Sequence, residues 1–408
     1  MNARPEDLAD LRRLPTVLRI RLEAVVPLSS FMVDDISSAD AVDDDGANWH
    51  LDAVHAREAW AHAVGTGVTV GVLDGGARFT HGALFTTYRG LHDDGRSLDH
   101  NYHWFDFVYG QRAPHDTLRG LGTQMIAVAA GAARAGVSVA PGARWMATNT
   151  CDRQYGCRER HIIQGIEFLL CPTDLRGRRR NCARGADVVL TAWAGLAGDA
   201  SFRHLLYVWS LAGVVPVVGA GDAGPRCSTL STPANSALAL GVGATDRSGR
   251  LAAFSGRGPG LGVFAKYDAA LFPTEKPDVV APGAAVRTAH VAADDAYIVA
   301  SGTHLAAASV AGVVALVLSA LPGAPFTTVH ALLVASATPP TLATAECVPA
   351  GAQFNRTYTP TYGYGHVNAA GAVALAAPTA KQALAEDGDE GKSAKRRATD
   401  TGQPDSYS

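Results

Sequence analysis

Three side chains that can do acid–base or metal chemistry stand at the ends of apolar segments of the chain. Asp74 and Asp222 each follow an apolar run, and His304 precedes one. Ligands of α/β proteins gather at such ends, and carboxylates together with an imidazole can hold a divalent ion. A metal site is therefore one hypothesis. We prefer the interpretation that the three residues are unlinked, and we expect neither a metal nor a cofactor.

The elements that must position these residues alternate in type along the middle of the chain. Runs of strand length cover residues 68–73, 143–148, 187–191 and 214–218, and runs of helix length cover residues 121–134, 161–170, 202–211 and 303–320. This alternation is typical of βαβ units in a parallel sheet with helices on both faces. The run Thr303–Ala320 has almost no charge, which predicts a central buried helix. We predict an α/β fold of three layers around a mostly parallel sheet.

Composition excludes several classes of function. The chain has 408 residues, 47% of them hydrophobic, 43 glycines and a net charge of −3, which predicts one large globular domain and no nucleic-acid partner. We expect no segment to approach the run of about 18 apolar residues that a membrane helix requires, because the longest apolar stretch, Val310–Leu318, is far too short. We therefore expect no membrane association, and we expect a monomer.

The two ends of the chain differ from its middle. Leu8–Leu22 predicts a short helix, a turn and a half-buried strand. Residues 31–48 form an acidic linker that contains Asp34–Asp45. Residues 379–408 have almost no large apolar side chain, which predicts a disordered tail.

Five motifs follow one another in a fixed order between Trp49 and Ala376. They are Gly67–Gly76, which contains Asp74 and is followed by His81-Gly82-Ala83-Leu84; Gly136–Ala143; Ala281-Pro282-Gly283; Ser301-Gly302-Thr303; and Tyr362–Ala369. The ordered set resembles the subtilisin family of serine peptidases (peptidase S8), most closely its bacillopeptidase-F-like branch. Single motifs match by chance, but ordered sets are far more specific. The resemblance implies a subtilisin-like fold for residues 49–378 and a propeptide-like remnant in residues 1–30.

The resemblance also implies which positions should carry the chemistry, and three of them are changed. Asp74 stands where the family has its catalytic aspartate. The others differ: Leu121 stands in place of the catalytic histidine, His304 in place of the nucleophilic serine, and Asp222 in place of the oxyanion asparagine. A leucine side chain neither donates nor accepts a proton, and an ionised carboxylate repels a developing oxyanion. Some processing proteases of the family have aspartate at the oxyanion position, so Asp222 alone decides nothing.

We therefore expect a pseudoprotease that acts, if it has a function, as a binding or regulatory protein with peptide or protein ligands in the former substrate cleft. The alternative is an active serine endopeptidase with a rearranged site, for example Ser301 with His115 or His81 as the base. Such a site would need hydrogen-bond geometry that displaced residues seldom restore. Because Leu121 and His304 cannot cut the chain, we also expect residues 1–30 to stay covalently attached.

The substrate-binding edges implied by the resemblance have changed as well. They comprise Ala192, Trp193, Ala194 and Gly195 on one side and Gly219, Ala220 and Gly221 on the other. In the family the first edge pairs with the peptide backbone as an added strand. If Ala194 stands at the position of the family's glycine, its methyl group would crowd such a peptide. If Gly195 stands at that position instead, the edge would remain open to a peptide. The sequence leaves both alternatives open.

The cysteines favour an extracellular ancestry. Cys151 with Cys157 and Cys171 with Cys182 form two closely spaced pairs, which suits small disulfide-closed loops and leaves Cys227 with Cys347 as a third bridge. Connectivity does not follow from sequence alone, so six separate thiols remain an alternative. Asn355 begins an N-glycosylation triplet. Residues 1–11 lack the apolar segment of a secretory signal, so we predict secreted ancestry without a visible signal peptide.

Overall fold

A seven-stranded sheet forms the centre of the protein in a computed structural model that describes residues 25–26, 48–154, 156–192, 195, 202–260, 275–340, 346–348 and 357–377. Its strand order is β10-β9-β8-β7-β2-β4-β3, and every neighbouring pair is parallel. The strands are β2 (Thr69–Asp74), β3 (Trp104–Asp106), β4 (Arg144–Asn149), β7 (Val188–Thr191), β8 (Val215–Gly219), β9 (Leu240–Thr245) and β10 (Val279–Pro282). The predicted α/β class and parallel sheet are confirmed.

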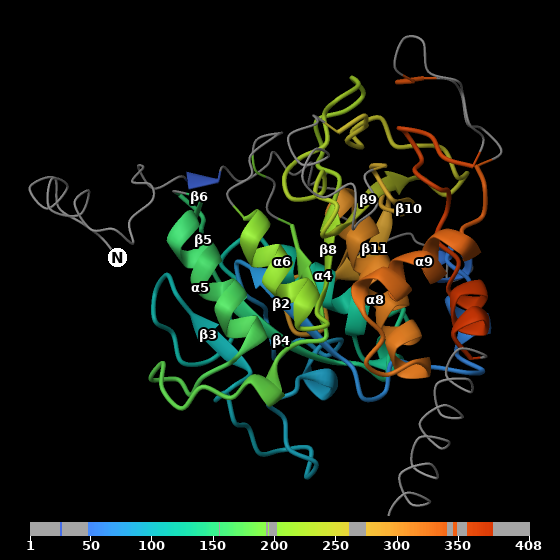
Figure 1. Cartoon of the computed structure of the whole chain (residues 1–408). Coiled ribbons are helices and arrows are strands. Elements are labelled where there is room, and N and C mark those ends of the chain that lie inside the picture. Colours follow the sequence, from blue (N-terminus) through green and yellow to red (C-terminus); the bar gives the residue numbers. More distant parts are fainter. Residues whose placement is uncertain are drawn as a thin grey trace, which may run out of the picture.

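Helices cover both faces of this sheet, because alternate side chains of its buried strands point to opposite faces. Val70 and Val72 of β2 belong to a core shared with α4 (Leu121–Ala130), α8 (Thr303–Ala320) and α9 (Phe326–Ser336). Leu73 belongs to a second core with α5 (Glu159–Leu170) and α6 (Arg203–Leu211). Figure 1 shows α5 and α6 in green on one side and α8 in orange on the other. The three layers are the architecture that the sequence predicts.

The helix α8 is the central element, and its side chains from Thr303 to Leu318 are all buried. Within the described residues it is the one helix that is long and apolar enough to cross a membrane, and 89% of it is buried inside the protein. The expectation that no segment would reach that length was therefore wrong. The burial of α8 is that of a core helix surrounded by the sheet, α4 and α9.

Smaller elements stand at the edges. β1 (Val25–Val26), β5 (Cys151–Asp152) and β6 (Gly156–Arg158) form an antiparallel sheet. β11 (Val286–Ala289) and β12 (Tyr297–Ala300) form a separate antiparallel pair. The short helices α2 (Trp49–Ala53) and α3 (Ala56–Ala59) precede β2. Three predicted segments lie outside the described residues: the elements expected at Leu8–Leu22, the acidic linker apart from its last residue, and the C-terminal tail.

The three expected disulfides are present: Cys151–Cys157, Cys171–Cys182 and Cys227–Cys347. Their Cα atoms lie 4.0, 3.8 and 5.3 Å apart, within the reach of a disulfide. The predicted pairing is therefore confirmed.

The helix α4 is shorter than predicted. It ends at Ala130 and not near residue 134, because Gly131 adopts an extended conformation.

Candidate functional site

Asp74 is the last residue of β2 and lies at the carboxyl end of the sheet, where only 1% of it is exposed. Its Oδ1 accepts a hydrogen bond from the backbone N–H of Gly75 at 2.7 Å. Burial raises the pKa of Asp74 to about 7, and the hydrogen bond from Gly75 opposes that shift. The group is therefore poorly stabilised as an anion.

Leu121 begins α4, the helix that packs beside the end of β2. The packing is close enough to require glycine, because a Cβ on Gly122 would lie 1.9 Å from the backbone oxygen of Gly76. Leu121 is 3% exposed and joins an apolar cluster with Leu73 and Leu118. A hydrocarbon thus occupies the start of α4, next to the segment that carries Asp74.

Asp116 fixes the start of α4. Its carboxylate accepts hydrogen bonds from the backbone N–H groups of Leu118, Gly120 and Thr123 at 3.0, 2.9 and 3.1 Å, and from the Thr123 hydroxyl at 2.8 Å. These bonds satisfy donors that a helix start leaves open. Asp116 also raises the pKa of Asp74, after the larger effect of burial. Sequence reasoning missed this residue, although an acidic residue just before a helical run is a helix-start signal.

His304 lies in the first turn of α8 and is 2% exposed. Its Nε2 lies 3.2 Å from Oε1 of Gln124 on α4. Because the amide oxygen only accepts, Nε2 carries a proton in this contact. Burial lowers the pKa of His304 to about 4. The two helices are thus joined by a buried hydrogen bond between His304 and a residue that sequence reasoning missed.

Asp222 follows β8 and turns its carboxylate toward the start of α8. Its Oδ1 accepts the backbone N–H of Thr303 at 2.8 Å, an arrangement that the positive end of a helix dipole favours. Burial raises the pKa of Asp222, and the hydrogen bonds from Thr303 oppose that shift. The Thr303 hydroxyl in turn accepts the backbone N–H of Gly221 at 3.1 Å. The Asp222 side chain therefore acts as a hydrogen-bond acceptor at this helix start.

The described substrate-edge residues are tightly packed. Ala220 is fully buried, and a Cβ on Gly219 would lie 2.7 Å from the Thr303 hydroxyl. The backbone N–H of Gly195 donates to the Thr232 oxygen at 2.8 Å, and the Thr232 N–H donates back to the Gly195 oxygen at 3.4 Å. Those groups of Gly195 are therefore not free to pair with a peptide strand. Ala192 is 8% exposed, and Trp193 and Ala194 lie outside the described residues.

The residues of the rearranged serine site are each bound to other groups. Ser301 Oγ accepts the backbone N–H of Ala285 at 2.9 Å. His81 bonds through Nε2 to the Ala296 oxygen at 2.7 Å and through Nδ1 to the Ala83 N–H at 3.0 Å. Both ring nitrogens of His81 are thus occupied.

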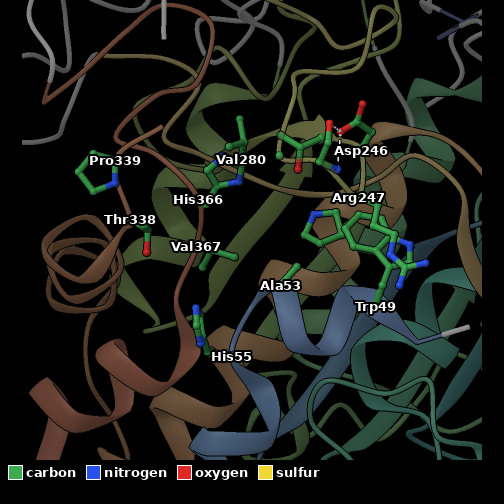
Figure 2. A pocket seen from close by; sticks show the side chains of 14 residues that line it. Trp49, Ala53, His55, Asp246, Arg247, Val280, Thr338, Pro339, His366 and Val367 are labelled. Atoms are coloured by element: carbon green, nitrogen blue, oxygen red, sulfur yellow. Dashed lines mark hydrogen bonds between the residues drawn. The ribbon is translucent and has the colours of Figure 1, made fainter. Parts of the chain in front are cut away.

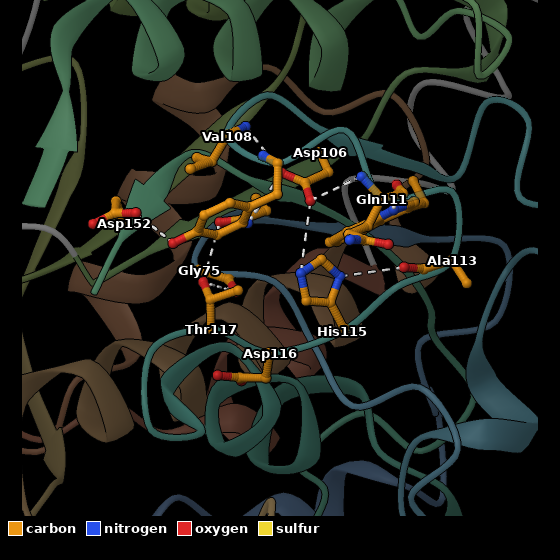
Figure 3. Close-up of polar contacts among 12 residues, drawn as sticks. Gly75, Asp106, Val108, Gln111, Ala113, His115, Asp116, Thr117 and Asp152 are labelled. Atoms are coloured by element: carbon orange, nitrogen blue, oxygen red, sulfur yellow. Dashed lines mark hydrogen bonds and ion pairs between the residues drawn. The ribbon is translucent and has the colours of Figure 1, made fainter. Parts of the chain in front are cut away.

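His115 forms a pair with a buried carboxylate. Its Nε2 lies 3.6 Å from Oδ2 of Asp106, and its Nδ1 lies 3.3 Å from the Ala113 oxygen. Figure 3 shows the His115 ring between these partners. Asp106 also accepts the backbone N–H groups of Val108 and Tyr109 at 2.9 Å. None of these described contacts joins Ser301 to His81 or His115.

The metal hypothesis finds no support in the part of the chain that the structure describes. No group of three or more His, Cys, Asp or Glu side chains there is arranged to hold an ion. Asp74, Asp222 and His304 instead contact Gly75, Thr303 and Gln124 respectively. Asn355 lies outside the described residues.

A pocket of about 310 Å³ lies away from these positions, beside the edge strand β10. Figure 2 shows Trp49, His55, Arg247 and His366 around it. Burial lowers the pKa of His366, so the ring is neutral near pH 7. The pocket shares no lining residue with the candidate site.

Comparison with known proteins matches residues 65–371 to the Subtilase family. The chain is 31% identical over 343 residues to Bacillopeptidase F of Bacillus subtilis (strain 168), across 81% of this chain and 22% of that protein. It is 26% identical to Subtilisin-like protease 3 of Pseudogymnoascus destructans, across 66% of this chain and 59% of that protein. It is 27% identical to Serine protease AprX of Bacillus subtilis (strain 168), across 66% and 62%. The chain thus spans less than two thirds of each of these relatives.

Proposed function

The chain belongs to the subtilase family, and from that premise we propose that it is a catalytically inactive member that acts as a binding or regulatory protein. The observation that carries the proposal is the buried hydrogen bond between His304 and Gln124. It occupies the start of α8, the position that the family resemblance assigns to the nucleophile. An imidazole whose Nε2 proton is held by an amide is neither a hydroxyl nucleophile nor its base.

Two further substituted positions, Leu121 and Asp222, support the proposal. Leu121 supplies no proton acceptor beside Asp74, and the raised pKa of Asp74 fits a carboxylate without an imidazolium partner. Asp222 accepts hydrogen bonds from Thr303, whereas an oxyanion requires a donor. In subtilisin, loss of the serine or the histidine alone lowers turnover about 10⁶-fold. Loss of both, with a changed oxyanion position, predicts no useful peptidase activity.

Binding in the former cleft is the role that we propose for the retained scaffold. The ligand would be a peptide or a protein segment, held mainly by side-chain contacts, because the N–H and oxygen of Gly195 already pair with Thr232. We further propose that the protein is a secreted monomer. The three disulfides fit an oxidising compartment.

The test is an activity assay on the purified chain with casein as substrate, combined with labelling by a serine-directed phosphonate. We expect no hydrolysis that rises with protein concentration and no phosphonate adduct in the intact mass. We also expect the same mass measurement to find residues 1–30 still attached in a protease-free preparation.

The control is the Asp74→Ala variant, prepared in parallel. Casein hydrolysis by the unmodified chain that disappears in Asp74→Ala would contradict the proposal. A phosphonate adduct on Ser301 would identify the rearranged serine endopeptidase instead.

A further inference from the structure

Positive charge is concentrated in one loop of this slightly acidic chain. Residues 171–184 contain five arginines and one aspartate, whereas the whole chain has a net charge of −3. The arginines are Arg176, Arg178, Arg179, Arg180 and Arg184, and all five are exposed. The loop follows α5 and is drawn in green in Figure 1. Whole-chain composition conceals this local excess of charge.

The backbone of this loop is fixed, so the arginines project from a defined support. The Cys171–Cys182 disulfide closes the loop. Within it, Oδ1 of Asp174 accepts the backbone N–H groups of Arg176 and Arg178 at 3.0 and 2.9 Å. The one acidic side chain of the loop thus forms its hydrogen bonds with the backbone, and it leaves a net positive charge on the loop.

Most of the guanidinium groups of the loop are available to a partner. Within the described residues, the side chains of Arg176, Arg178 and Arg179 form no hydrogen bond and no ion pair within 4 Å, although Arg178 and Arg179 lie near enough to Asp174 to lower its pKa. Arg180 lies 3.8 Å from Glu167, and both side chains are more than half exposed. An exposed pair of this kind is weak.

The loop borders a pocket of about 430 Å³ that adds further arginines. Arg89, Arg144 and Arg184 line it, together with His103 and the carboxylates of Asp93 and Asp99. Arg144 lies 3.7 Å from Asp93, an exposed pair. His103 accepts the Arg89 Nε hydrogen at Nδ1 over 2.8 Å, so its other nitrogen carries a proton and is a donor. The guanidinium group of Arg89 makes five hydrogen bonds within the protein, to Thr69, Tyr102, His103, Arg184 and Gly185, so it supports the pocket and is not available to a partner. We call the five loop arginines with Arg144 the arginine patch.

The arginine patch lies at the end of the sheet opposite to the candidate site. Arg144 is the first residue of β4. The backbone oxygen of Arg184 accepts a hydrogen bond from Arg89, which also donates to Thr69 at the start of β2 over 3.2 Å. Asp74 is the last residue of β2, about 17 Å along the strand from Thr69. A partner on the patch would leave the former cleft open.

We propose that the arginine patch binds an anionic polysaccharide, a chain of sulfated or carboxylated sugars. Guanidinium groups bind such anions in a bidentate manner, and the disulfides fit an extracellular setting, where such polymers occur. The loop carries no aromatic residue, and the Tyr102 ring is covered by Arg184 at 4.8 Å, which disfavours a partner that stacks its bases on aromatic rings. The pocket is lined mostly by charged and polar side chains, and the larger of its two apolar residues, Leu91, is only 7% exposed, so it offers little of the apolar surface that anchors protein segments and membranes.

The experiment measures binding of the full chain to heparin, a sulfated polysaccharide, at several NaCl concentrations. The test variant combines Arg176→Gln, Arg178→Gln and Arg179→Gln, three exposed side chains without a described hydrogen bond or close ion pair. We expect its affinity at physiological salt to fall roughly 10- to 100-fold, and the slope of log affinity against log salt to fall by about three. A thermal melt of the variant checks that it is folded.

The matched control removes the same charge elsewhere through Arg112→Gln, Arg226→Gln and Arg250→Gln, all exposed. We expect this control to keep heparin affinity within about threefold, because long-range effects are screened. Equal binding by the test variant and the unmodified chain would overturn the proposal. Tighter arginine-dependent binding to duplex DNA, a phosphoserine peptide or phosphatidylglycerol vesicles than to heparin would also overturn it, because the partner would then belong to another class.

Discussion

His304 Nε2 donates a hydrogen bond to Gln124 Oε1 over 3.2 Å, and both side chains are buried where α8 meets α4. The amide oxygen of Gln124 accepts the proton of the neutral imidazole, whereas the amide nitrogen of Gln124 is buried without a hydrogen-bond partner among the described residues. Burial lowers the pKa of His304 to about 4. The pair is therefore neutral near pH 7, and it joins two helices without a charge.

The first prediction concerns this pair. Gln124→Met approximately preserves size but removes the acceptor, so the buried His304 N–H loses its hydrogen bond to Gln124, and we expect the free energy of unfolding to fall by about 1–3 kcal/mol. The measurement is urea unfolding at pH 7.5. The double variant Gln124→Met with His304→Leu should lose less free energy of unfolding than the sum of the losses in the two single variants, by about 1 kcal/mol or more. Strictly additive effects would show that the hydrogen bond contributes nothing.

The second prediction concerns Asp74. Burial raises its pKa from 3.8 to about 7, so the folded protein binds this proton more tightly than the unfolded chain does. The resulting stabilisation is fully present below pH 4 and is lost as the pH rises through 7. This difference in pKa corresponds to roughly 4 kcal/mol at most. His304, with its lowered pKa, acts in the opposite direction: its stabilisation is lost as the pH falls from 6.5 through 4.

The Asp74→Asn variant isolates the Asp74 contribution, because His304 is present in both proteins. We expect this variant to be about as stable as the parent at pH 4.5 and more stable by a few kcal/mol at pH 8.5, measured by urea unfolding. A stability difference that does not change with pH would mean that Asp74 is not desolvated.

The third prediction concerns a buried ionic cluster beside the start of β10. Lys276 Nζ lies 2.5 Å from Asp278 Oδ2, and His330 Nε2 lies 2.9 Å from the other carboxylate oxygen. These contacts hold the pKa of Asp278 low against its burial. Lys276→Met leaves part of this charge unbalanced, and we expect a loss of about 3–5 kcal/mol in the free energy of unfolding.

The comparison variant for Lys276 is Arg57→Gln, which breaks the exposed pair between Arg57 and Asp52. We expect it to cost less than about 1 kcal/mol. Similar losses for the two variants would show that burial does not set the strength of the Lys276 pair.

Much of the fold could be predicted because its central elements are long apolar runs. The strand expected at residues 68–73 is β2, at Thr69–Asp74, and the buried helix expected at Thr303–Ala320 has those bounds. The strand β1 was not predictable: it has two residues, and its pairing with β6 depends on a contact between distant segments. Short strands carry too little pattern to be identified.

The candidate site was predictable in position but not in contacts. Strand and helix ends locate Asp74, Asp222 and His304, because parallel strands present their carboxyl ends at one edge. The partner of His304 was not predictable, since Gln124 is 180 residues away in sequence and meets it only through packing of α4 on α8. The direction of the Asp222 carboxylate, toward Thr303, likewise depends on three-dimensional packing.

The last prediction is that a few side chains, and not the scaffold, prevent peptide hydrolysis. Asp74 is the last residue of β2, and Gly122 at the start of α4 packs against Gly76. The backbone of residue 121 therefore lies close to the segment that carries Asp74, and we expect a histidine side chain at this position to reach the carboxylate. Combining Leu121→His, His304→Ser and Asp222→Asn should produce casein hydrolysis above that of the unmodified chain. Each single change should do almost nothing, because triad members act as a unit. Adding Asp74→Ala should remove the gained activity, and a folded triple variant without activity would contradict the prediction.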